Sequence, residues 1–296
     1  MINLCTVSDI NFLIKGLTLY ESIISHNKDC ILHYLCIDDE SYNKLLELKI
    51  KNLKPYNVTE FLTKDKNLKM LKSWDYKYFC WSLASYFSNF LLEKNNFDIT
   101  YIDSDIFFHQ DIKTLLDEIG TNEIGIFRHR QFPLSNERPE GFYNVGVVHF
   151  KNKEYGRLIL KWWSDAVLHM KYPHLATCGD QKYLDEFPLM CPKDCIFIDG
   201  DIGHGAPWQW QLYDFSDYEE NGNIIWEDKI QKLIFTHFSQ FELLPNNYVP
   251  SKMHHIYTPL KDYNDIKELK IIYDEYYNNL KLTKKKYENS LWDDCI

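Results

Sequence analysis

Residues 99–108 constrain the fold more than any other stretch of the chain. An apolar, β-prone run leads into Asp103 and Asp105, and a second apolar run follows at once. This pattern predicts a buried strand that ends at the surface and carries two carboxylates out of the core. Ligands of open α/β sheets bind beyond the carboxyl ends of the strands, so the two aspartates are candidate ligands for Mg²⁺ or Mn²⁺ carrying a diphosphate. Taken alone, Asp-x-Asp is also common in solvated turns and helix caps.

Strand and helix signals alternate along the chain, which is typical of an α/β protein with a doubly wound, mostly parallel sheet. We expect strands at 2–8, 30–37, 56–61, 99–102, 107–109, 123–127, 144–150 and 233–238. We expect helices at 17–25, 41–51, 78–93, 111–119 and 154–170, one starting near 178–185, and one from 264 onward. No linker or repeat interrupts the chain, so we expect one domain over 1–260 and a C-terminal helical extension over 261–296.

The composition of the 296 residues limits the function classes. A formal net charge of -10 argues against a general nucleic-acid binder. The sequence has no basic-then-apolar leader and no stretch of 18 apolar residues, so we expect a cytoplasmic protein without a transmembrane segment. The lysines at 284–286 allow weak contact with the inner face of an anionic membrane. Nothing in the sequence indicates an oligomeric state.

The eight cysteines are scattered and include no CxxC pair, which favours reduced thiols. A zinc site drawn from Cys178, Cys191, Cys195 and His174 has a spacing that matches no common ligand framework.

The phosphate-binding loops GxGxxG and GxxxxGK[ST] are both missing, so phosphate must be held by another device, for which the Asp-x-Asp site is the candidate. Gly146 beside Asn144 indicates close approach of backbone to a ligand. Asp180 either caps a helix or faces the crevice. The basic residues at 128–130 are either a solvated loop or a contact for substrate oxygens. The aromatic loop at 196–216 is typical of a wall of a sugar or base pocket.

Five segments in order resemble the retaining nucleotide-sugar glycosyltransferases of family 8, which have the GT-A fold, and the resemblance runs from residue 2 to about 241. The segments are Thr6-Val7-Ser8-Asp9 with Phe12 and Lys15-Gly16, Tyr101-Ile102-Asp103-Ser104-Asp105, Phe142-Tyr143-Asn144-Val145-Gly146-Val147, Gly179-Asp180-Gln181 through Leu184, and His237-Phe238. The whole string is also similar to a group of uncharacterised bacterial proteins described as glycosyltransferases.

The resemblance implies a role for each segment. Thr6, Val7 and Asp9 would read the base of a nucleoside diphosphate sugar, and Phe12 would stack on it. Ser104 and Gly146 would also contribute to binding the donor. Asn144, Asp180 and Gln181 would line the sugar and form the catalytic group. The acceptor would be a hydroxyl group of a glycan or another molecule, and the configuration of the sugar would be retained.

The resemblance also implies a metal site made of Asp103, Asp105 and His237. Two carboxylates and one imidazole favour Mn²⁺ over Mg²⁺, because a nitrogen ligand suits a transition metal. A lone strand histidine is otherwise more often structural than a ligand.

The sequence departs from the family after His237-Phe238. Where the family has a glycine and then a lysine that contacts the diphosphate, this chain has Ser239-Gln240-Phe241-Glu242. Either Arg128, Arg130 or Lys252 would take the place of that lysine, or the metal would carry more of the charge of the leaving diphosphate. This departure slightly favours an alternative, a non-catalytic nucleotide- or glycan-binding module of the same fold, whereas the presence of Asp103, Asp105 and Asp180 argues against it. A nucleotidyltransferase would need a basic, Gly-rich loop after the first strand, which is absent.

Overall fold

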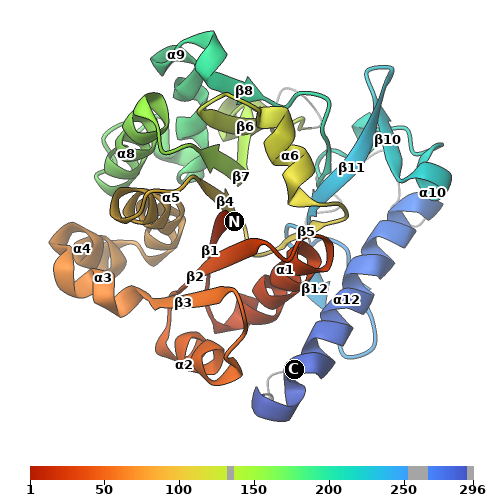
Figure 1. Ribbon diagram of the computed structural model, residues 1–296, viewed down its shortest axis with the longest axis horizontal. Helices are drawn as coiled ribbons and strands as arrows, with labels where there is room; N and C mark the ends of the chain where they lie inside the picture. The colour runs from red at the N-terminus through yellow and green to blue at the C-terminus, as the bar shows by residue number, and fades with distance from the viewer. Residues whose placement is uncertain (132–136, 253–265, 292–296) are drawn as a thin grey trace.

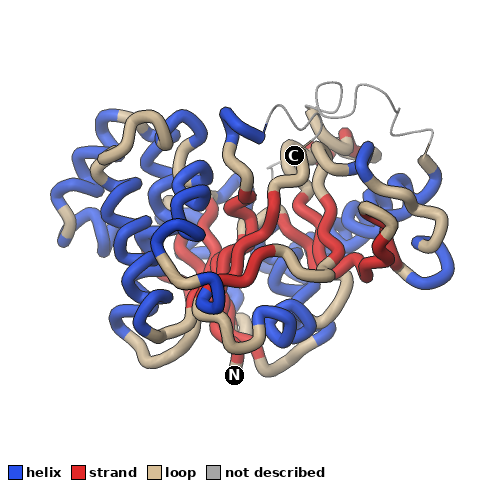
Figure 2. The backbone as a smooth tube through the Cα atoms, turned by 90° about the horizontal axis from the view of Figure 1, so that it is seen from above, coloured by secondary structure: helices blue, strands red, loops and turns tan. Residues whose placement is uncertain are grey.

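The computed structural model describes residues 1–131, 137–252 and 266–291. A seven-stranded sheet forms its centre, and helices cover both faces of that sheet (Figures 1 and 2). In spatial order the strands are β3 (Leu53–Asn57), β2 (Cys30–Cys36), β1 (Ile2–Ser8), β4 (Ile99–Ile102), β7 (Tyr143–Phe150), β6 (Ile124–Arg128) and β8 (Ile196–Ile198). Only β7 runs antiparallel to its neighbours, so the prediction of an α/β fold with a mostly parallel sheet is confirmed.

A smaller sheet lies beside the central one and contains His237, the third residue of the predicted metal site. Its strands are β10 (Asn223–Trp226), β11 (Lys229–His237) and β5 (Ile106–Phe108), with β9 (Gly203–Gly205) also paired to β11. A separate short hairpin follows, formed by β12 (Glu242–Leu243) and β13 (Tyr248–Val249). Because β5 begins directly after Asp105, the Asp-x-Asp turn joins the two larger sheets.

The helices mostly follow the predicted order, with shifted ends. They are α1 (Leu13–His26), α2 (Asp39–Leu48), α3 (Val58–Lys64), α4 (Lys66–Trp74), α5 (Tyr76–Lys94), α6 (Ile112–Ile119), α7 (Glu137–Glu140), α8 (Glu154–Leu168), α9 (Phe187–Met190), α10 (Tyr218–Asn221) and α12 (Lys267–Leu291). The C-terminal helix is confirmed, whereas its expected start at 264, the 260/261 boundary and Cys295 lie outside the described residues.

Two predicted elements were wrong, the first because of a helix cap and the second because of a glycine turn. The expected strand at 56–61 ends at Asn57, because the Asn57 side chain accepts a hydrogen bond from the Thr59 amide and starts α3. The expected helix from 178 is replaced by two short 3-10 turns, Ala176–Cys178 and Gln181–Glu186. Gly179 between them has φ +65, which breaks the helix and favours glycine.

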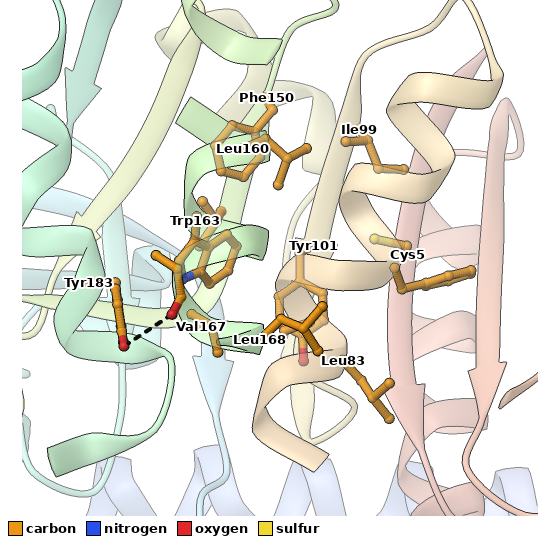
Figure 3. Packing of buried hydrophobic residues seen from close by; sticks show 14 of the residues in the cluster. Cys5, Leu83, Ile99, Tyr101, Phe150, Leu160, Trp163, Val167, Leu168 and Tyr183 are labelled. Atoms are coloured by element: carbon orange, nitrogen blue, oxygen red, sulfur yellow. Dashed lines mark hydrogen bonds between the residues drawn. The ribbon is translucent and has the colours of Figure 1, made fainter. Parts of the chain in front are cut away.

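Alternating strand residues build a separate core on each face of the sheet. Cys5 and Tyr101 join the core under α5 and α8, whereas their neighbours Leu4 and Ile102 join the core under α1 and α6. Figure 3 shows Trp163 of α8 in the first of these cores, packed near Phe150. Trp163 is fully buried, and it holds α8 against the end of β7.

The long helix α12 closes the far side of the smaller sheet (Figure 1). Phe238, at the end of β11, stacks on Tyr276 of α12 with ring centroids 3.8 Å apart. Within the described ranges, no helix combines the length and the apolar character that crossing a bilayer requires.

Candidate active site

Strand pairing brings three ligand-type side chains together at the junction of the two sheets. The Asp103 amide donates to the Gly146 carbonyl over 2.8 Å, which continues the β4–β7 ladder. Strand β11 pairs antiparallel with β5 so that His237 lies opposite Ile106. As a result, ligand atoms of Asp103, Asp105 and His237 all lie within 4.8 Å of one another, and this is the group of three metal-ligand residues found in the described part of the chain.

The Nε2 atom of His237 faces both carboxylates. It lies 3.1 Å from Oδ1 of Asp105 and 3.7 Å from Oδ2 of Asp103. The other ring nitrogen, Nδ1, lies 3.3 Å from Oδ1 of Asn144, an oxygen that can only accept. Nδ1 therefore carries a hydrogen in either protonation state of the ring, and Nε2, which faces the two carboxylates, is the atom that would bind a metal once it has lost its proton.

Burial and mutual charge decide the protonation of this group. Burial opposes ionisation of Asp105, but His237 and Lys15 outweigh it and lower the pKa of Asp105 to about 2. Burial raises the pKa of Asp103, and His237 offsets this only in part. Burial disfavours the charged form of His237 as well, yet Asp105 and Asp103 raise its pKa. The site is thus short of positive charge in the absence of a cation.

These residues fit a divalent cation on three counts. The donor atoms converge, the His237 tautomer presents Nε2, and Tyr101 orients Asp103 by donating from its hydroxyl to Oδ1 over 2.7 Å. Two carboxylates and one imidazole suit Mn²⁺.

A relay of amide side chains connects His237 to the far wall. Asn144 donates from Nδ2 to Oε1 of Gln181 over 2.8 Å, and Gln181 donates from Nε2 to the Glu140 carbonyl over 2.9 Å. The Gly146 amide donates to Oδ1 of Asn144 over 2.9 Å. A Cβ at Gly146 would lie 2.8 Å from Nδ1 of His237, so the absence of a side chain is what allows this close packing.

A cleft of about 720 Å³ opens over this group. It is lined by Val7, Ser8, Asp9, Phe12, Ile37, Lys77, Cys80, Trp81, Ala84, Tyr101, Asp103, Ser104, Asp105, His129, Glu140, Asn144, Val145, Thr177, Cys178, Asp180, Gln181, Trp208, His237 and Ser239. The cleft thus brings together all the predicted site residues except Thr6, which is fully buried in β1, and Gly146, which supports His237 from behind.

The end of the cleft at the carboxyl end of β1 contains the predicted base-binding residues. Asp9 accepts a hydrogen bond from the Phe12 amide over 3.1 Å and so caps the short 3-10 helix Ile10–Phe12. Phe12 remains 42% exposed, which leaves ring surface available to a ligand.

Asp180 lies at the opposite wall, next to Gln181. Its side chain is 3% exposed, and its carbonyl accepts a hydrogen bond from Nε1 of Trp163 over 3.0 Å. Burial, with a smaller contribution from the Asp103 charge, raises the pKa of Asp180 well above its usual range. Asp180 does not cap the following turn with its side chain, and it is one of the residues that line the cleft.

Lys15 is a functional candidate that our sequence reasoning did not assign. Its Nζ donates to the Phe241 carbonyl over 2.9 Å and lies 4.6 Å from the centre of the Phe12 ring. Its charge helps to lower the pKa of Asp105. In the sequence, Lys15 belongs to the Lys15-Gly16 pair of the segment that resembles a nucleotide-base loop. Gly16 is needed there because a Cβ at this position would clash with the Tyr34 ring.

The basic residues expected to replace the family's lysine lie elsewhere. Arg130 is 1% exposed and donates to Asp199, Tyr213 and Gln231, so it is a structural residue. Arg128 lines a separate cavity together with Arg130. Lys252 pairs with Glu242 over 2.9 Å. It lines a neighbouring cavity together with Lys15, and that cavity shares Phe12 and Asp105 with the cleft.

The chain is similar to two proteins of Bacillus subtilis (strain 168), each described as an uncharacterized protein. It is 30% identical to YfnF over 260 residues, covering 83% of both chains. It is 25% identical to YfnD over 248 residues, covering 81% of this chain and 78% of YfnD. No family model matches the chain.

Solved structures of glycosyltransferases share the fold. The galactosyltransferase LgtC, solved with donor and acceptor sugar analogs, superposes with a TM-score of 0.56 at 13% identity, over 95% of this chain and 96% of that chain. Mouse xyloside xylosyltransferase 1, in its apo form, gives 0.52 at 14% identity over 80% of this chain and 97% of that chain. The fold of this chain is therefore the GT-A fold of these glycosyltransferases.

Proposed function

This chain belongs to the same family as YfnF of Bacillus subtilis, and from its GT-A fold and the geometry of its cleft we propose that it is a metal-dependent glycosyltransferase. It would transfer a sugar from a nucleoside diphosphate sugar, in the first instance a UDP-sugar, to a hydroxyl group of a glycan or similar acceptor. The observation that carries the proposal is the convergence of Asp103, Asp105 and His237 at the floor of the cleft.

Asp103, Asp105 and His237 would hold Mn²⁺, or Mg²⁺ in its place. When bound, such an ion supplies Lewis-acid stabilisation of the negative charge that develops on the departing diphosphate. Lys15 adds a fixed positive charge beside Asp105, in the role for which the sequence lacks a lysine after His237.

The remaining cleft residues would bind and orient the donor. Asp9 and Phe12 lie where a base would bind, with backbone groups of Val7 beside them. Asn144 donates a hydrogen bond to Gln181, and Gln181 donates to the Glu140 carbonyl, so the two side chains would present a preorganised polar wall to the sugar. Asp180, whose pKa burial raises well above its usual range, would line the sugar beside Gln181.

Retention of configuration is part of the proposal. Gln181 and Asp180 line the same cleft as the metal group, and either of them would stabilise an oxocarbenium-like centre.

Nucleotide release tests the proposal directly. The protein is incubated with Mn²⁺ and a panel of UDP- and GDP-sugars, and free UDP or GDP is measured. We expect release from at least one donor, its loss in excess chelator, and its loss in Asp105→Asn. The surface variant Asp117→Asn, whose carboxylate pairs with Lys113 on α6, is the matched control. Binding of nucleotide without any release would instead identify a non-catalytic binding module.

A further inference from the structure

The side chains of the basic segment at 128–130 line two different cavities. Arg128 and Arg130 line one cavity, whereas His129 lines the cleft that contains the metal group. The His129 ring packs edge-on against Trp208 with centroids 5.0 Å apart, and Trp208 packs edge-on against His237 at 5.4 Å. His129 therefore lies one aromatic ring away from the metal group, at a wall that no donor-binding role described above uses.

The hydrogen bonding of His129 determines its tautomer. Nδ1 lies 3.2 Å from the carbonyl oxygen of Gly141, and a carbonyl can only accept, so Nδ1 carries the hydrogen. Burial lowers the pKa of His129 to about 4, which keeps the ring neutral at neutral pH. The lone pair of the neutral ring is then on Nε2.

Nε2 of His129 is available to a ligand. No described residue makes a hydrogen bond to it, and it is not among the fully enclosed polar atoms that lack a partner. The backbone around it is fixed, because the His129 carbonyl accepts from Nε1 of Trp208 over 3.0 Å and from Nε2 of Gln209 over 2.9 Å. Its amide donates to the Phe142 carbonyl over 2.7 Å. Nε2 is thus a rigid, uncharged hydrogen-bond acceptor in the cleft wall.

We propose that this wall, formed by His129 and Trp208, is the acceptor subsite, and that Nε2 of His129 accepts a hydrogen bond from a hydroxyl group of a carbohydrate acceptor. The inference rests on the proposed function. A neutral acceptor atom selects a ligand that can donate, so it favours a sugar hydroxyl over a carboxylate or phosphate oxygen. The adjacent Trp208 is 5% exposed and lines the same cleft, so it contributes a small apolar surface beside Nε2.

Two substitutions separate this role from a structural one. Asparagine at position 129 can reproduce the Nδ1 bond to the Gly141 carbonyl but has no acceptor where Nε2 lies. Glutamine can place an acceptor oxygen near the Nε2 position but loses the bond to Gly141. If His129 only supports the loop, His129→Asn retains activity and His129→Gln loses it. If His129 binds the acceptor, the order is reversed. His174→Asn, at an exposed histidine, is the matched control.

The readout is UDP or GDP release with and without a panel of neutral methyl glycosides. We expect at least one glycoside to accelerate release by the wild type. We expect His129→Asn to raise the KM for that glycoside about tenfold, the effect of one lost hydrogen bond, with a much smaller change in the KM for the donor. His129→Gln should lie closer to the wild type. A thermal melt of each variant checks folding.

A spectroscopic measurement covers the case in which a variant does not fold. The ¹⁵N signal of Nε2 in wild-type His129 should have the position of an unprotonated nitrogen and should shift when the methyl glycoside is added. An Nε2–H tautomer, an unshifted signal, wild-type KM values in His129→Asn, or donor hydrolysis that no glycoside accelerates would each overturn the assignment. Failure of the wild type to release nucleotide from any donor would overturn the proposed function itself, and the subsite with it.

Discussion

The Nε2 atom of His237 lies 3.1 Å from Oδ1 of Asp105, because β11 and β5 pair with His237 opposite Ile106. The pair partly neutralises itself, since each group favours the charged form of the other. Asp103 adds a second carboxylate, so one cation can satisfy the whole group.

Removing the Asp105 carboxylate should separate function from stability. We expect Asp105→Asn to reduce metal-dependent nucleotide release by about a hundredfold or more, because one of three ligands is lost. The apo melting temperature should stay close to that of the wild type, because the lost attraction to His237 is offset by relief of repulsion from Asp103. Thermal melts with and without Mn²⁺ provide the measurement: Mn²⁺ should stabilise the wild type and leave the variant unchanged. Equal stabilisation of both proteins would contradict the assignment.

The missing side chain at Gly146 should matter for metal binding. In Gly146→Ala the new Cβ would lie 2.7 Å from Oδ1 of Asn144 and 2.8 Å from Nδ1 of His237, so the imidazole must move. We expect about tenfold weaker Mn²⁺ binding and a loss of about 1–3 kcal/mol of stability from overpacking. Gly222→Ala is the control, because its Cβ would meet no atom within 4 Å, although its φ of +69 still disfavours alanine. Gly222→Ala should lose about 1 kcal/mol of folding stability and should bind Mn²⁺ as tightly as the wild type.

Lys15 should contribute to nucleotide binding. Lys15→Met removes the positive charge beside Asp105 but keeps most of the apolar stem. We expect the Kd for UDP in the presence of Mn²⁺ to rise roughly tenfold, as for the loss of one charge-assisted contact. Isothermal titration measures this, with Lys113→Met on α6 as a control whose Kd should not change. An unchanged Kd for UDP in Lys15→Met would show that Lys15 does not replace the diphosphate-binding lysine of the glycosyltransferases that the sequence resembles.

The buried pair of Arg130 and Asp199 should control acid stability. Burial opposes ionisation of Asp199, but His204 and Arg130 outweigh it and lower its pKa. A lowered pKa means that this stabilisation is present above the unfolded pKa of about 4 and is lost as pH falls through the lower folded value. Asp199→Asn should therefore cost about 3 kcal/mol at pH 7, because Arg130 is left buried without its partner. In urea unfolding, the difference from the wild type should shrink below about pH 4. A difference that is independent of pH would rule out the charge pair as its source.

Local chemistry in the sequence determined much of the architecture. The β-prone run before Asp103 is strand β4, and Asp111 caps α6 by accepting from the Lys113 amide, because both features depend on near neighbours. Gly146 also carried a local signal of close approach, which the structure explains by the position of His237.

The tertiary structure alone decided which distant residues meet. The register of β5 on β11 places His237 beside Asp105, and no spacing in the chain encodes that register. No feature of the local sequence distinguishes the role of Arg130 from that of His129 either. Arg130 donates hydrogen bonds to Asp199, whereas His129 lines the cleft. Hydrophobic periodicity specifies the face that an element buries, whereas partners across sheets depend on how the whole chain packs, and a binding site is made of such partners.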